Sequence, residues 1–169
     1  DRETGVLYLW PPSDPVAADA QLSILAEPLV QIRGASWITL EGLVLEMGQD
    51  GGVVIADGDH CLVAGCTIRR LGGTATTING GMAHGIFGCH LHDLGRNGTW
   101  VKGGDRRTLT PAGHFVENCH IHHFSRIART YTPAVFLDGV GNRIAHNRIH
   151  DTPCHALRIE GNDHVIEFN

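Results

Sequence analysis

Aliphatic and polar positions alternate in six copies of one short pattern along the chain. Each full copy runs aliphatic, outward-facing, small or Asn, Cys or Asn, outward-facing, aliphatic. The last aliphatic residues of the five full copies are spaced by 23, 23, 30 and 28 positions, and they are Leu45, Ile68, Leu91, Ile121 and Ile149. This alternation predicts a β-strand bent at one residue and does not fit the 3.6-residue period of a helix.

A second short apolar strand is predicted before each copy, and nearly all of these strands are followed within three residues by Gly. They cover residues 29–32, 52–55, 75–78, 99–101, 134–137 and 156–159. Short strands, Gly turns and this repeat length predict an all-β parallel β-helix, a solenoid of about six coils of roughly 22–30 residues each. A leucine-rich repeat would need a fixed Leu frame, and a β-sandwich would need regular hairpin turns. Neither signal is present.

The repeat occupies residues 29–169, which are expected to form one β-helix domain. Residues 1–28 are expected to form a lead-in segment that packs on this helix. The sixth copy of the pattern stops at Asn169 before it is complete. We therefore expect the helix to be truncated there, and the chain to be the N-terminal fragment of a longer solenoid.

Composition and charge narrow the range of partners. Charged residues make up 18% of the chain, the formal net charge is −5, and Lys102 is the only lysine. The basic residues form no run longer than two, so a surface for the phosphate backbone of a nucleic acid is not expected. No apolar stretch approaches the ~18 residues of a membrane span, so a membrane is not expected as a partner either.

Three segments of the repeat resemble the right-handed parallel β-helix repeat family of the pectate-lyase-like superfamily. They read NCHIH at 118–122, HNRIHD at 146–151 and GNDHVIEFN at 161–169, and the resemblance extends over about residues 29–169. Residues 1–12 are similar to the segment that precedes the helix in large bacterial members, including those similar to glycoside hydrolase family 141. The resemblance implies a bacterial protein located outside the cell or in the periplasm, and no cofactor is expected.

The resemblance also implies three sheets in each coil, with a right-handed path. The outer face of the first sheet would form the floor of a substrate cleft, and the long loops before it would form the cleft wall. A ladder of stacked polar side chains would occupy the bend between the second and third sheets. In this sequence the bend would hold Cys66, Cys89, Cys119, Asn147 and Asn169.

One outward column of the first sheet carries the candidate catalytic groups. Lys102, Asp138 and Glu160 would follow one another in successive coils, where their titrations could be coupled. Two carboxyl groups one coil apart would also approach the ~5 Å separation of a retaining glycosidase pair. His155, in the loop before the last first-sheet strand, is a candidate proton-transfer group. The alternative is a surface ion pair between Lys102 and Asp138, a solvated Glu160, and a His155 bonded to backbone.

The neighbouring column and a long loop carry the candidate substrate-binding residues. Trp100 and Phe136 would offer flat faces for sugar rings, and Arg158 follows them in the column. Arg129 and Tyr131 lie in the loop 122–133 and are expected to overhang the same sheet.

Three functions remain open at this point, and the expected partner is a polysaccharide or oligosaccharide. The leading interpretation is a polysaccharide-degrading glycoside hydrolase, or part of one, that uses Asp138 and Glu160. A polysaccharide lyase would instead use Lys102 as the base. A third possibility is a β-helix module without catalysis, with a glycan-binding or structural role. The class of substrate is implied by the resemblance.

Histidines and cysteines raise two further questions. Two outward columns on the third sheet would carry His90 with His120, and His92 with His122 and His150. These imidazoles could bind Zn²⁺, Ni²⁺ or Cu²⁺, but side chains on a flat column converge poorly, so a solvated histidine ladder without metal is favoured. The cysteines of the bend are expected to be buried reduced thiols.

Overall fold

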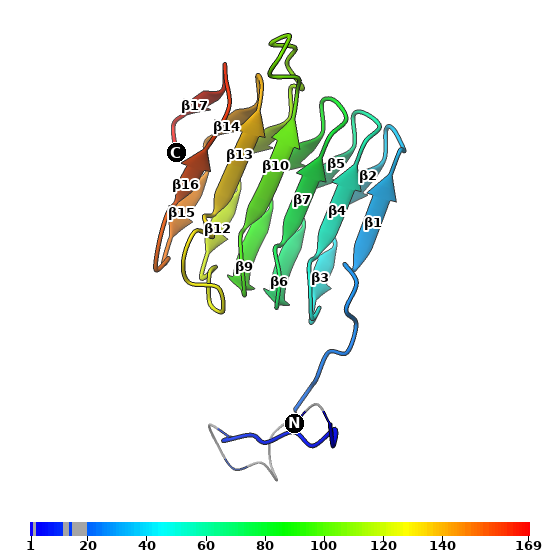
Figure 1. The fold of residues 1–169 in the computed structure, drawn as a ribbon, viewed down its shortest axis with the longest axis vertical. Helices are drawn as coiled ribbons and strands as arrows, with labels where there is room; N and C mark the ends of the chain where they lie inside the picture. The colour runs from blue at the N-terminus through cyan, green and yellow to red at the C-terminus, as the bar shows by residue number, and fades with distance from the viewer. Residues whose placement is uncertain (2, 12–13, 15–19) are drawn as a thin grey trace.

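The computed structural model describes residues 1, 3–11, 14 and 20–169 of the chain. Within these residues all regular structure is β, from β1 (Val30–Arg33) to β17 (Val165–Glu167), and no helix is long and apolar enough to cross a membrane. The strands wind into a helix of stacked coils, and the neighbouring strands of each sheet run parallel (Figure 1). The predicted right-handed parallel β-helix of about six coils is confirmed.

The first sheet contains the opening strand of each coil. After β1 its strands are β4 (Val53–Ala56), β7 (Thr76–Asn79), β10 (Thr99–Gly103), β13 (Val135–Gly139) and β16 (Leu157–Ile159), paired in that order. The register places Trp100 opposite Phe136 and Lys102 opposite Asp138. Phe136 is in turn opposite Arg158. The predicted outward columns of this sheet are therefore present.

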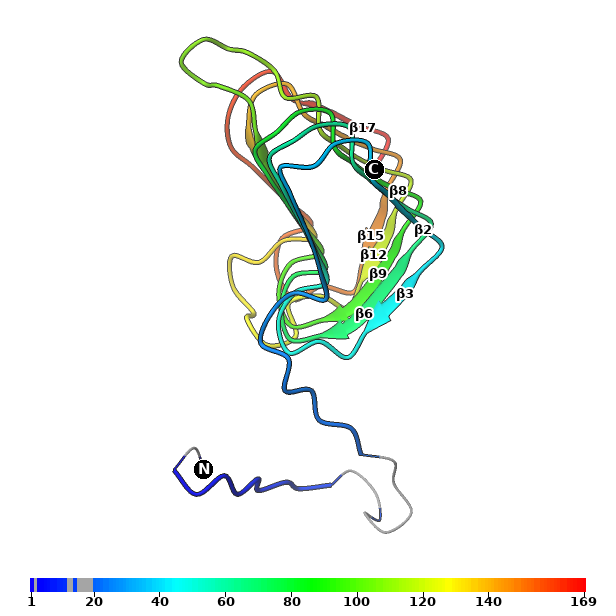
Figure 2. The same cartoon turned by 90° about the vertical axis from the view of Figure 1, so that its right-hand side faces the viewer.

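The second and third sheets face the first sheet across the interior (Figure 2). The second sheet contains β2 (Thr39–Glu41), β5 (Leu62–Ala64), β8 (Gly85–Phe87), β11 (Phe115–Glu117), β14 (Arg143–Ala145) and β17. The third contains β3 (Val44–Glu46), β6 (Thr67–Leu71), β9 (His90–Leu94), β12 (His120–His122) and β15 (Arg148–His150). Their inward side chains form the core, where Ile68, Leu91 and Ile121 are fully buried in one column.

The bend between the second and third sheets is made in every coil by a residue with a left-handed backbone conformation. These residues have φ between 53° and 66°, and they are Gly42, Gly65, Gly88, Asn118, His146 and Phe168. Gly and Asn adopt this conformation at low cost, which explains why small residues or Asn recur at this position of the repeat. The next residue then points inward and begins the ladder of the bend.

The ladder at this bend consists of cysteine thiols in the earlier coils and asparagine amides in the later coils. Cys66, Cys89 and Cys119 are buried free thiols, as expected. The backbone N–H of Cys119 donates to Oδ1 of Asn147 at 2.9 Å, and that of Asn147 donates to Oδ1 of Asn169 at 3.1 Å. A hydrogen bond with Cys89, together with burial, raises the pKa of the Cys119 thiol. The Cys119 thiol is therefore uncharged at neutral pH.

A second ladder, which was not predicted from the sequence, lines the bend between the first and second sheets. The backbone N–H of Cys61 donates to Nδ1 of His84 at 3.1 Å, and that of His84 donates to Nδ1 of His114 at the same distance. The N–H of His114 donates to Oδ1 of Asn142, whose own N–H donates to Nδ1 of His164. Burial lowers the pKa of His84, and burial with the neighbouring His84 lowers that of His114 to about 4.

The described residues of the segment 1–28 form no strand. They lead away from the coils in Figures 1 and 2, and large apolar side chains among them are exposed, including Trp10 at 95%. The expected packing of this segment on the helix stays a prediction. Arg2, Pro12, Ser13 and residues 15–19 lie outside the described residues.

Candidate functional site

The outer face of the first sheet lies between two long loops. Residues 104–114 extend beyond the ends of the strands, and residues 123–134 lie at their beginnings, as the upper and lower loops of Figure 1 show. The lower loop projects on the side of the first sheet (Figure 2). The face is thus a strip that crosses the strands between the two loops.

Four of the predicted residues form a stacked row on this face, and a fifth lies at its end. The rings of Trp100 and Phe136 have centroids 4.0 Å apart. The guanidinium carbon of Arg158 lies 5.2 Å from the Phe136 centroid and 5.9 Å from that of Tyr131. The rings of Tyr131 and His155 follow at 6.3 Å. The aromatic row, Trp100–Phe136–Arg158–Tyr131–His155, therefore runs across β10, β13 and β16 to the loops beside them.

The members of the aromatic row differ in what they offer a ligand. Trp100 is 39% exposed and Tyr131 is 71% exposed, whereas Phe136 is only 5% exposed. Phe136 is covered by its neighbours Trp100 and Arg158, so it supports the row instead of offering a free face. The surfaces available for stacking are the rings of Trp100 and Tyr131.

The candidate catalytic carboxylates lie in one column but belong to two ion pairs. Lys102 Nζ is 3.7 Å from Asp138 Oδ2, and Asp138 Oδ1 accepts the backbone N–H of Gly139 at 2.7 Å. Glu160 Oε1 accepts from Arg158 Nη2 at 2.5 Å and from Arg158 Nε at 3.0 Å. The predicted pair of Lys102 and Asp138 is present, and Arg158 connects the carboxylate of Glu160 to the aromatic row.

Two predicted residues have other surroundings than expected. The exposed His155 has its Nδ1 2.8 Å from the sulfur of Cys154, and its ring faces Tyr131. Arg129 lines a small hollow with Phe124 and Asp151, where the third sheet ends. The described contacts therefore do not bring Arg129 into the aromatic row.

A hollow of about 510 Å³ extends the face over the earlier coils. Trp100 lines one part of it, together with Asn79 and Arg33 of the first sheet. Asp50 and Arg96 line it from the turns before β4 and β10. Neither Asp50 nor Arg96 was predicted from the sequence, where the candidate charged groups lie in the last three coils. The sequence feature that could have indicated them is a charged residue at the equivalent position before each of two first-sheet strands.

The third sheet presents its histidines on the opposite side of the coil. The register pairs His120 with His90, and His122 with His92 and His150, so the predicted columns are confirmed. Burial lowers the pKa of His120, with His150 contributing. Burial and the neighbouring His120 lower the pKa of His122 to about 4. Both rings are therefore neutral at neutral pH.

Comparison with known proteins identifies the fold family. The family model described as "Right handed beta helix region" matches residues 29–169, which is most of the chain. No curated protein and no solved structure matches the chain. A β-helix of this kind is consistent with a carbohydrate-active or a structural role. The extent of the match, together with three parallel sheets, shows that the chain belongs to the right-handed β-helix family.

Proposed function

We propose that the chain binds a polysaccharide or oligosaccharide along the outer face of the first sheet and hydrolyses it with Asp138 and Glu160. The observation that supports this most is the aromatic row beside two carboxylates in successive coils. The hollow lined by Trp100 continues the same face. A glycan lying across the strands would pass from the hollow over Trp100 toward Tyr131.

The chemistry of these side chains suits a sugar. The exposed rings of Trp100 and Tyr131 provide apolar faces, and sugar rings stack on such faces through their C–H groups. Asp138, Glu160 and Arg158 supply hydrogen-bonding groups for hydroxyls beside them. In hydrolysis, one carboxyl group would protonate the leaving oxygen while the other acts as nucleophile or base. Lys102 and Arg158 would position the two carboxylates.

A binding experiment tests the aromatic row. Affinity for a panel of neutral and acidic polysaccharides is measured by affinity electrophoresis and by calorimetry. We expect Trp100→Ala to weaken binding at least about tenfold, because it removes the main stacking face. Trp37→Ala is the matched control. Trp37 is also an exposed tryptophan, but it lies in the turn after β1, where its ring stacks on that of His60 and takes no part in the aromatic row. Equal losses in both variants would contradict the proposed location.

A product assay then tests catalysis on the glycan that binds best. Asp138→Asn and Glu160→Gln should each abolish the release of reducing ends while binding is retained. Glu46→Gln is the control, because Glu46 is also ion-paired, to Arg69, but lies on the third sheet. An unsaturated product that depends on Lys102 would support the lyase instead. Binding without any product would indicate a glycan-binding module, and no binding would contradict a role with glycans.

A further inference from the structure

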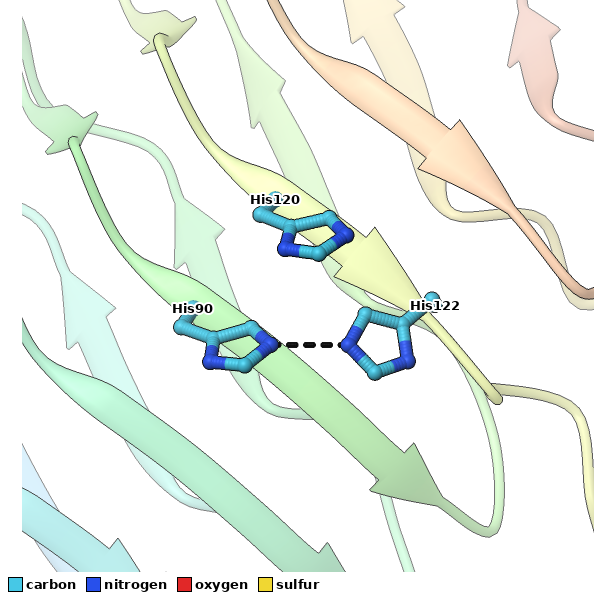
Figure 3. A group of neighbouring side chains, drawn as sticks. All are labelled: His90, His120 and His122. Carbon is cyan, nitrogen blue, oxygen red and sulfur yellow. Dashed lines mark hydrogen bonds between the residues drawn. The ribbon is translucent and has the colours of Figure 1, made fainter.

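A cluster of imidazoles on the third sheet converges more closely than a flat column allows. Nε2 of His90 lies 2.7 Å from Nε2 of His122, which is diagonally across on the next coil (Figure 3). One ring nitrogen from each of His90, His120 and His122 lies within 4.8 Å of the other two. The ring of His122 is tilted by 42° against His90 and by 43° against His120. This tilt removes the objection that side chains of a flat column converge poorly.

A fourth imidazole approaches the same group from the following coil. Nε2 of His150 lies 2.7 Å from Nε2 of His120. Nδ1 of His150 is 2.8 Å from a carboxylate oxygen of Asp151, so this nitrogen must carry the hydrogen. The Nε2 of His150 therefore carries a lone pair, and in the free protein this lone pair accepts a hydrogen bond from Nε2 of His120. A histidine that binds a metal through one ring nitrogen commonly donates its other ring N–H to a carboxylate in this way.

The distances fit a metal ion with modest side-chain adjustment. Imidazole nitrogens bind Zn²⁺ at about 2.0–2.1 Å, which places tetrahedral ligand atoms about 3.4 Å apart. The closest pair, Nε2 of His90 and Nε2 of His122 at 2.7 Å, would open slightly, and the widest pair, within 4.8 Å, would close. The three rings are half-buried and come from the adjacent strands β9 and β12, so only small rotations are needed.

We propose that His90, His120 and His122 bind one divalent transition-metal ion of the Zn²⁺, Ni²⁺ or Cu²⁺ type, with His150 placed to join them. Neutral imidazoles suit these ions, whereas Ca²⁺ and Mg²⁺ prefer oxygen ligands. The bound ion cross-links two coils, and the carboxylate of Asp151, which is hydrogen-bonded to His150, would balance part of its charge. Arg148 ends the column of His90 and His120 and so limits the site on that side. This site is separate from the proposed glycan face.

In the free protein each close pair of nitrogens shares one hydrogen. Binding the metal requires a lone pair on Nε2 of each ligand, so the hydrogen of each pair moves to Nδ1 of the ring that carries it. In the pair with His150 that ring is His120. No proton is lost when a ring only changes tautomer. The alternative to a metal site is a permanent hydrogen-bonded histidine ladder, in which these pairs stay closed whatever metal is offered.

Zinc binding to tag-free, chelator-treated protein tests the proposal by competition with a chromophoric chelator. We expect one Zn²⁺ per chain, and at least about tenfold weaker binding for His120→Gln and for His122→Gln. His60→Gln and His146→Gln are matched controls and should bind as the wild type does. Ca²⁺ should not compete. Binding that is absent in the wild type, or that falls equally in the control variants, would overturn the proposal.

A second measurement needs no variant and is therefore independent of folding defects. Long-range ¹H–¹⁵N spectra of the imidazoles are recorded while Zn²⁺ is added to the wild-type protein. We expect the Nε2 signals of His90, His120 and His122 to shift together and to saturate at one equivalent. Shifts confined to exposed rings such as His60 and His155 would overturn the proposal, and so would gradual shifts of all histidines.

Discussion

Two buried histidines each connect one coil to the preceding coil by a side-chain hydrogen bond. His84 and His114 are fully buried, and each accepts a backbone N–H from the preceding coil through Nδ1. An accepting Nδ1 puts the hydrogen on Nε2, and Nε2 of His84 donates it to the carbonyl of Asp57. The neutral ring is thus required by the hydrogen bonds of the bend, and protonation would remove an acceptor in the core.

We expect this requirement to make stability depend on pH. The pKa of His114 is lowered from 6.5 to about 4, so the unfolded chain binds a proton in a range where the folded protein does not. The contribution of His114 to the free energy of unfolding is fully present above pH 6.5 and is lost as the pH falls toward about 4. The shift corresponds to about 3 kcal/mol. Urea unfolding at neutral pH and near pH 4 measures the loss.

His114→Asn separates this effect from general acid sensitivity. Asn142 occupies the equivalent position of the next coil and accepts through Oδ1, so Asn suits the ladder and does not titrate. The variant should have a smaller stability difference between the two pH values than the wild type. His155→Asn, at an exposed site, should leave the difference unchanged. An unchanged difference in His114→Asn would contradict the assignment.

At the scale of the strand pair, the bend between the second and third sheets depends on one backbone conformation. Gly65 has φ of 57° there, and an added Cβ would meet no atom within 4 Å. His146 adopts the same conformation in a later coil and stacks on Phe168 at 5.1 Å. The position therefore accepts a side chain sterically, and what it costs is the left-handed conformation itself.

Gly65→Ala isolates that cost. We expect a loss of about 1–2 kcal/mol in the free energy of unfolding, because no packing changes and only the backbone is strained. Gly65→Asn should lose less, since Asn tolerates this region and already stands at position 118. Denaturant unfolding of the three proteins provides the comparison. Equal stability of Gly65→Ala and wild type would show that the bend can relax.

The elements were largely predictable, and the reason is local. A strand that buries one face must alternate, so the inward residues Ile68, Leu91 and Ile121 marked their strands without any knowledge of neighbours. The histidine ladder at the other bend was missed because His84 and His114 resemble outward polar residues in a sequence. The positions of the loops 104–114 and 123–134 relative to the first sheet were expected only from the resemblance.

Across the whole molecule, stability comes from stacking one coil on the next. Ile121 lies inside its column, between Leu91 and Ile149 in register. Its side chain has no exposed surface, so it contributes to the packing of both neighbouring coils. A defect there is therefore felt on both sides, as expected for a solenoid held by nearest-neighbour contacts.

Ile121→Ala should destabilise the protein by about 2–5 kcal/mol through lost burial and the cavity left behind. Ile127→Ala is the control, because Ile127 is 74% exposed, and its loss should stay within about 0.5 kcal/mol. Urea unfolding followed by circular dichroism measures both. A small effect of Ile121→Ala would mean that the coils can close around the gap.

The sequence by itself determined most of the coil: its strands, the bend within each repeat copy, and the columns in which equivalent residues stack. Inward positions have only one environment, so a repeating pattern of burial is enough to define them. Only the tertiary structure decided which outward groups meet. Trp100 covers Phe136, Arg158 pairs with Glu160, and His90 reaches diagonally to His122. An outward side chain can contact either adjacent coil or the solvent. Which contact forms depends on its rotamer and on the nearby loops, and the repeat pattern specifies neither.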